Sequence, residues 1–139
     1  MGDPFDLQRF VAAQEPVFGE VCAELRAGRK RSHWMWFIFP QLRGLGSSAM
    51  AERFGISSLP EALAYLRHPV LGARLRECAQ LALEAPAGEA EEIFGPVDAV
   101  KLRSSLTLFC RAAPEEPVFR AALDRYFGGQ PDALTLDRL

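Results

Sequence analysis

The 139-residue chain has few of the residues that build metal centres or disulfide frameworks. It contains two histidines and three cysteines, and their spacing forms no metal-ligand pair. Cys22, Cys78 and Cys110 are odd in number and lie among apolar residues, which favours buried, reduced thiols. The N-terminus also lacks the basic, apolar and small-residue succession of a signal peptide, and no apolar run is long enough to cross a membrane. We therefore expect a cytoplasmic protein with no metal, no cofactor and no membrane association.

Strong charge of either sign is missing as well. The formal net charge is -2, so the chain as a whole has no attraction for nucleic acid, and its aromatic residues form one unbroken run instead of a displayed surface. No nucleophile elbow, ordered Cys-His pair or Walker motif is present. The sequence therefore does not favour nucleic-acid binding, and no motif in it identifies a reaction. The oligomeric state is not encoded in any of these features.

What the sequence does contain is helical periodicity. Apolar residues recur at spacings near 3.6, and prolines, glycines and capping residues mark the ends of these segments. The predicted helices cover 7–14, 16–27, 49–54, 59–66, 69–81, 95–109 and 119–127, with one more turn in 131–139. Ser58 to Glu61 reads as a capping box, and His68 before Pro69 predicts a break with a capping or structural histidine. The prediction is an all-α fold, a single multihelical domain spanning residues 1–139.

One segment departs from this periodicity. Three cations, Arg29 to Arg31, are followed after Ser32 and His33 by six large apolar residues, Trp34 to Phe39. A run with no amphipathic period must be covered on all sides, either as a central strand or as a short buried helix. Its tryptophans, beside Lys30, His33 and Gln41, are suited to wall a pocket for a planar anionic ligand, or they are plain core.

The residues around this run resemble the bacterial and plant proteins of the domain-of-unknown-function family 1810. The string from Gly28 to Leu42, apart from Arg31, carries the resemblance. Further matching residues follow in order along nearly the whole chain: Gly44 to Gly46, Ala64 to Leu66, His68 to Gly72, Ile93 to Gly95, Asp98, Lys101, Leu102, Ser104, Ser105, Thr107 to Phe109, and Tyr126 with Phe127. The resemblance implies a small multihelical fold with a short buried central helix at Trp34 to Phe39. Some members have been labelled calpastatin, a label that nothing in this chain supports. The family supplies no established activity.

A polar stripe marks the predicted helix after Pro96. Asp98, Lys101, Ser104 and Ser105 lie at spacings of three, four and seven, which places them on one side of that helix. A solvated face with one weak ion pair is one interpretation. Serines lower helix propensity, however, so a face that handles a hydroxylated or phosphorylated ligand is the other.

Two weaker candidates complete the set. The loop from Gly44 to Ser48 can present backbone amides to an anion, although a plain loop that caps the next helix explains the same residues. His33 lies at the polar edge of the aromatic run. Two interpretations are open for it: packing in the core, or a role in the site.

Two functions of different classes remain. The first is a binding protein or hydrolase for a small phosphorylated ligand, a nucleotide or an ADP-ribose-like compound. In this hypothesis Trp34 or Trp36 stacks on a base. The cations Arg29, Lys30 and Lys101 face phosphate, Gln41, Ser104 and Ser105 add polar contacts, and the catalytic candidates are Asp98 and His33. The alternative is a non-catalytic interaction module in which the aromatic run is purely structural and the cations from Arg26 to Arg31 dock an acidic partner.

Overall fold

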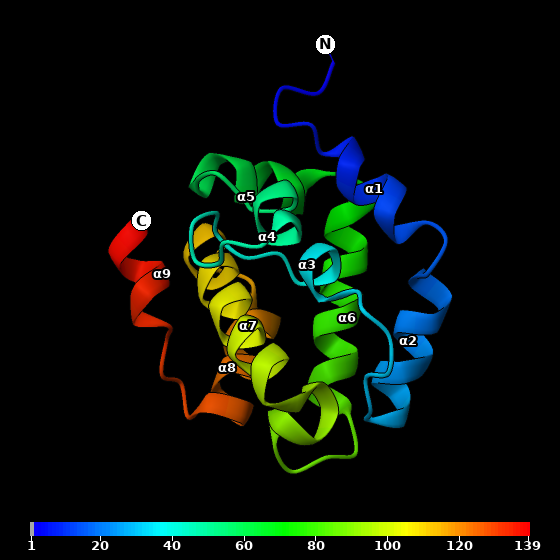
Figure 1. The fold of residues 1–139 in the computed structure, drawn as a ribbon. Coiled ribbons are helices and arrows are strands. Elements are labelled where there is room, and N and C mark those ends of the chain that lie inside the picture. Colours follow the sequence, from blue (N-terminus) through cyan, green and yellow to red (C-terminus); the bar gives the residue numbers. More distant parts are fainter. Residues whose placement is uncertain (1) are drawn as a thin grey trace.

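The computed structural model describes residues 2–139, in which helices joined by loops are the regular secondary structure (Figure 1). The helices are α1 (Gln8–Gln14), α2 (Phe18–Ala27), α3 (Met35–Ile38), α4 (Ala49–Arg53), α5 (Leu59–Arg67), α6 (Leu71–Glu84), α7 (Ala90–Ala112), α8 (Pro117–Phe127) and α9 (Ala133–Arg138). Extended pairing in residues 2–139 amounts to one isolated bridge between Leu42 and Ile56. The predicted all-α fold is confirmed.

Helices α6 and α7 are the two long elements around which the others are arranged (Figure 1). Helix α8 packs against both of them, α5 packs against the same two, and α2 covers the outer side of α6. Helix α9 returns to lie along α7, which places the C-terminal segment beside the middle of the chain. Within the described chain, no helix combines the length and apolar character needed to cross a membrane.

The aromatic run forms the short buried helix α3, as predicted. Met35, Phe37 and Ile38 are buried within it, and Trp34 and Phe39 flank it with exposed fractions of 1% and 0%. Helix α3 packs against α1 and α6, so a four-residue helix is surrounded by longer ones. A helix this short is not stable by itself, and its conformation depends on this packing.

Glu24 of α2 holds the chain that leads into α3. Its carboxylate accepts hydrogen bonds from the backbone N–H of Arg31 (2.7 Å), from the backbone and hydroxyl of Ser32 (3.1 and 2.5 Å) and from Trp34 Nε1 (2.9 Å). Burial alone would raise the pKa of Glu24, but these hydrogen bonds lower it from 4.5 to about 2. The carboxylate is therefore ionised at neutral pH and ties the segment 31–34 to α2.

The predicted helix ends are largely confirmed. Gly28 ends α2 in the left-handed region with φ 72°, and Ser48 caps α4 by accepting from Ala51 N at 3.1 Å. The predicted capping box is only half formed: Ser58 accepts weakly from Glu61 N at 3.4 Å, whereas Glu61 Oε1 accepts from the backbone and hydroxyl of Ser57 (2.9 and 2.7 Å). His68 ends α5. It also caps α6, because its Nδ1 accepts hydrogen bonds from the N–H groups of Val70 (3.1 Å) and Leu71 (3.2 Å).

The start of α7 differs from the sequence prediction. The sequence predicted a helix from residue 95, whereas helical structure begins at Ala90 and is interrupted at Gly95. Gly95 has φ 78° and ψ 165°, a conformation that is essentially restricted to glycine. Ile93 and Phe94 are buried in the turn before it, so burial of two large side chains organises a stretch that the sequence prediction left outside the helix.

Candidate functional site: a groove between α7, α9 and the Gln41–Ser48 loop

Helix α7 exposes hydrophobic side chains on the side that faces α9. Val97 and Val100 of α7 are 67% and 62% exposed, and Leu134 of α9 is 65% exposed. These three are the large hydrophobic side chains with high exposure in the described structure, and all of them line the same groove. The groove has a volume of about 450 Å³ and is completed by Pro96, Lys101 and Ser104 of α7, by Gln41, Leu45 and Gly46 of the preceding loop, and by Asp132.

Lys101 is the cation of this groove. Its Nζ lies 3.3 Å from Asp98 Oδ1 and 4.6 Å from the centre of the Trp36 ring. Both contacts direct the ammonium toward the N-terminal half of α7 and toward α3. The Lys101 side chain is 22% exposed and lines the groove, and an ammonium has three protons to donate.

Lys30 occupies the other side of Asp98 and is almost fully buried, with a side chain that is 7% exposed. Its Nζ lies 2.9 Å from Asp98 Oδ2, donates to the carbonyl of Ser32, and lies 4.9 Å from the Trp34 ring centre. The one carboxylate of Asp98 thus contacts two lysines, one through each oxygen. The cluster carries one positive charge in excess.

Asp132 also lines the groove and, at the level of Ser104, joins α9 to α7. Its Oδ2 accepts from Ser104 Oγ at 3.0 Å, from Thr135 N at 3.1 Å and from the Thr135 hydroxyl. Its backbone N–H donates to Thr107 Oγ1 at 2.9 Å. These bonds fix the carboxylate in place and leave Oδ1 with no donor among the described residues.

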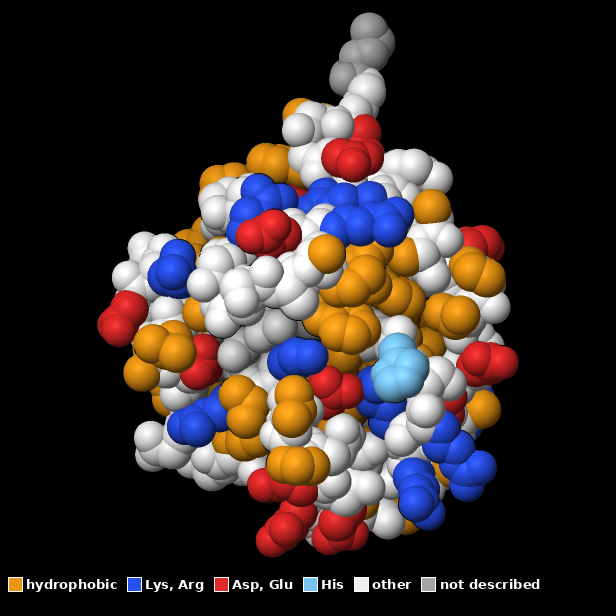
Figure 2. All heavy atoms as spheres, viewed as in Figure 1, with side chains coloured by type: hydrophobic (Ala, Val, Ile, Leu, Met, Phe, Trp, Pro, Cys, Tyr) orange, Lys and Arg blue, Asp and Glu red, His pale blue; other side chains and the backbone are white. Residues whose placement is uncertain are grey.

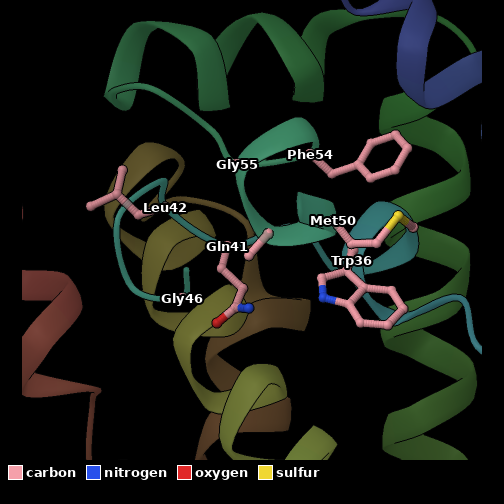
Figure 3. Close-up of a pocket in the computed structure, with 8 residues that line it drawn as sticks. Trp36, Gln41, Leu42, Gly46, Met50, Phe54 and Gly55 are labelled. Carbon is pink, nitrogen blue, oxygen red and sulfur yellow. The ribbon is translucent and has the colours of Figure 1, made fainter. Parts of the chain in front are cut away.

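A second, shallow hollow adjoins the groove and shares Gln41 and Gly46 with it (Figure 3). Trp36 and Met50 both line it, and the side chain of Gln41 points toward α7. Its volume of about 10 Å³ holds no more than a water molecule.

On the surface, hydrophobic side chains gather in the middle of this face, with basic side chains above and below them (Figure 2).

Comparison with known proteins places the chain in a family. A family model described as a protein of unknown function (DUF1810) matches residues 4–139. The chain belongs to this family. Among solved structures, it is similar to the conserved hypothetical protein Rv1873 from Mycobacterium tuberculosis, with 59% identity and a TM-score of 0.97 over 99% of this chain and 98% of that chain. No curated protein matches.

The predicted stacking role of Trp34 is wrong in this DUF1810 protein. Trp34 is 1% exposed, its Nε1 donates to Glu24, and its ring packs near Phe39 and Phe94. No surface of the indole is open to a ligand. Trp36 is half-buried and lies beside the groove under Lys101, so it is the tryptophan available for contact.

The polar stripe of α7 is also corrected. Ser104 and Ser105 are buried, with exposed fractions of 4% and 1%, so they do not form a solvated face. Helix α9 covers Ser104 through Asp132, and the Ser105 hydroxyl is buried with no partner in the described structure. Of the stripe, Lys101 and the edge of Ser104 reach the groove.

The remaining predicted residues divide between the groove and the open surface. Gln41 lines the groove, and Lys30 supports it from within the protein. Arg29 and His33 are exposed and are not part of its lining. Sequence reasoning missed Asp132 and the exposed valines, although apolar residues on two sides of the predicted α7 were a visible signal. Within residues 2–139 no cluster of three or more His, Cys, Asp or Glu is placed to hold a metal ion.

Proposed function

We propose that the protein binds a small phosphorylated ligand of nucleotide size in the groove between α7 and α9. The observation that carries this proposal is the coincidence of exposed apolar side chains with an available cation: Val97, Val100 and Leu134 line the groove that also contains Lys101. Ligand pockets are mostly apolar with a few convergent polar groups, and they range from about 300 to 1,000 Å³. The volume of about 450 Å³ lies within this range.

The apolar walls favour a ligand with a flat or hydrophobic body. Each exposed valine or leucine forgoes the free energy of burial, which is about 1.5–3 kcal/mol for a complete side chain. A bound base or ring that covers them recovers part of this free energy. Isolated exposed hydrophobic residues are common, but their convergence on one concave surface is typical of a binding site.

The charges favour an anionic end. Lys30 neutralises Asp98 from the buried side, and the charge of Lys101 is therefore not cancelled within the cluster. A charge-assisted hydrogen bond from Lys101 to phosphate contributes about 1.5–3 kcal/mol. Gln41 on the facing loop adds an amide that can donate to or accept from the ligand.

Binding is favoured over hydrolysis in this geometry. Asp98 was the candidate base, and each of its oxygens is held by a lysine at 2.9 or 3.3 Å. His33, the other candidate, is exposed and does not line the groove. Neither residue is placed to activate a water molecule against a ligand seated on Val97 and Val100.

A thermal-shift and calorimetric screen tests the proposal. Its probes are AMP, ADP, ADP-ribose, ribose 5-phosphate and inorganic phosphate. A ligand at about one hundred times its Kd should stabilise the fold by roughly 2.7 kcal/mol. Lys101→Ala should fold normally, because Asp98 stays paired with Lys30 when this partly buried lysine is removed. It should nevertheless weaken binding by about tenfold or more.

Arg26→Ala is the matched control, because it also removes a cation from a weak pair, with Glu77 at 3.9 Å, but on α2 and outside the groove. It should leave binding unchanged. A Lys101→Ala protein that keeps the full wild-type affinity would contradict the proposal. Absence of any shift in the wild type would instead favour the interaction module, in which the exposed Arg29 and Arg31 contact an acidic partner.

A further inference from the structure

We propose that the groove selects nucleotides whose base carries an exocyclic amino group, and that Asp132 is the residue that recognises this group. This inference rests on the proposed function, since it assigns a base-recognising role to a second residue of the same groove. Asp132 lines the groove, and its carboxylate is oriented before any ligand arrives.

The orientation of Asp132 is set by bonds to one oxygen only. Oδ2 accepts from Ser104 Oγ, Thr135 N and the Thr135 hydroxyl, and these donors come from both α7 and α9. Oδ1 has no donor within residues 2–139. A carboxylate held by one oxygen presents the other as a fixed acceptor, so a ligand that donates to it pays little of the entropic cost of ordering the side chain.

The length of the groove suits a nucleotide. Lys101 Nζ is directed to the level of Asp98, and Asp132 is bonded at the level of Ser104. These two levels are six residues apart on α7, about 9 Å along the helix axis. A mononucleotide can place its phosphate at one end and its base at the other. Inorganic phosphate cannot reach both, and Val97, Val100 and Leu134 provide apolar surface for the base in the same groove.

The chemistry of a carboxylate decides which base is accepted. An ionised carboxylate only accepts hydrogen bonds, so it pairs with the exocyclic amino groups of adenine, cytosine and guanine. Hypoxanthine and uracil carry a carbonyl oxygen at the corresponding position, and two acceptors that face each other are both left unpaired. A site built to hydrogen-bond one group discriminates strongly against an analogue that lacks it, because the buried polar group then has no partner.

The test uses ligand pairs that differ at this one position. Isothermal titration calorimetry should show that the wild type binds AMP about tenfold or more tightly than IMP, and CMP more tightly than UMP. Asp132→Asn keeps an oxygen for Ser104 and Thr135 and replaces the free acceptor with an amide donor. It should weaken AMP by about tenfold, preserve IMP, and so remove or reverse the preference.

Lys101→Ala is the control, and it should weaken AMP and IMP equally, because both carry the same phosphate. Equal affinities of the wild type for AMP and IMP would overturn the inference, even if D132N did not fold, and would leave the proposed function intact. An unchanged AMP to IMP ratio in folded D132N would also overturn it. If ribose 5-phosphate bound in a Lys101-dependent manner while nucleotides did not, the inference would fail alone. If no phosphorylated ligand bound, both proposals would fail.

Discussion

Trp34 and Trp36 lie two residues apart at the same short helix, yet they belong to different parts of the molecule. Trp34 is 1% exposed and bonded to Glu24, whereas Trp36 is half-buried and lies beneath Lys101 at the edge of the groove. Residues two apart on a helix point in directions about 200° apart. A run of apolar residues without an amphipathic period therefore still has an inner and an outer face, and only the outer one is available for function.

The largest effect should come from breaking the inner face. Trp34→Ala should lower the free energy of unfolding by about 3–5 kcal/mol, because it removes a buried indole and leaves a cavity beside Phe39 and Phe94. Trp36→Ala should cost about 1 kcal/mol, because its ring is already partly in water. Urea unfolding measures both values. Equal losses at the two positions would remove the distinction between the faces.

Glu24 should have the next largest effect, because it anchors the inner face. Glu24→Gln should lower the free energy of unfolding by about 1–2 kcal/mol at pH 7, since hydrogen bonds to a charged acceptor become hydrogen bonds to a neutral one. The folded pKa of Glu24 is about 2, below its ordinary 4.5, so its contribution is present above pH 4.5 and is lost as the pH falls toward 2.

Unfolding measured from pH 7 to pH 2 tests this directly. The difference between wild type and Glu24→Gln should shrink as the pH falls through that window. The Arg26→Ala protein, altered two residues along α2 at an exposed position, should track the wild type throughout. A difference that stayed constant with pH would mean that the charge of Glu24 does not stabilise the segment 31–34.

The sequence predicted the helices and the buried run well because these depend on local signals. Helical period, the glycine at 28, the serine at 48 and the histidine before Pro69 act within a few residues, and each does what it predicted. The start of α7 was missed because burial of Ile93 and Phe94 is decided by packing against distant helices.

The groove was harder to predict because apolar side chains of α7 are exposed there while polar ones are buried. Val97 and Val100 face solvent while Ser104 and Ser105 are buried, contrary to the usual distribution on a surface helix. For Ser104 the cause is α9, which lies along α7 and covers this serine with Asp132. No pattern within residues 131–139 indicates which part of the protein this segment packs against. The sequence therefore could not predict that Asp132 and Lys101 line the same groove.

The smallest effect separates the two neighbouring serines of α7. Ser105 Oγ is buried without a partner in the described structure, whereas Ser104 Oγ donates to Asp132 at 3.0 Å. Ser105→Ala should therefore raise the free energy of unfolding by about 1 kcal/mol, since it removes an unsatisfied hydroxyl and improves helix propensity. Ser104→Ala should lower it by about 1 kcal/mol, since it leaves Asp132 short of a donor. Thermal melts of the two variants compare the same substitution one residue apart. A loss of stability for Ser105→Ala as large as that for Ser104→Ala would show that the Ser105 hydroxyl is hydrogen-bonded. The two serines would then both contribute a hydrogen bond to the stability of the fold.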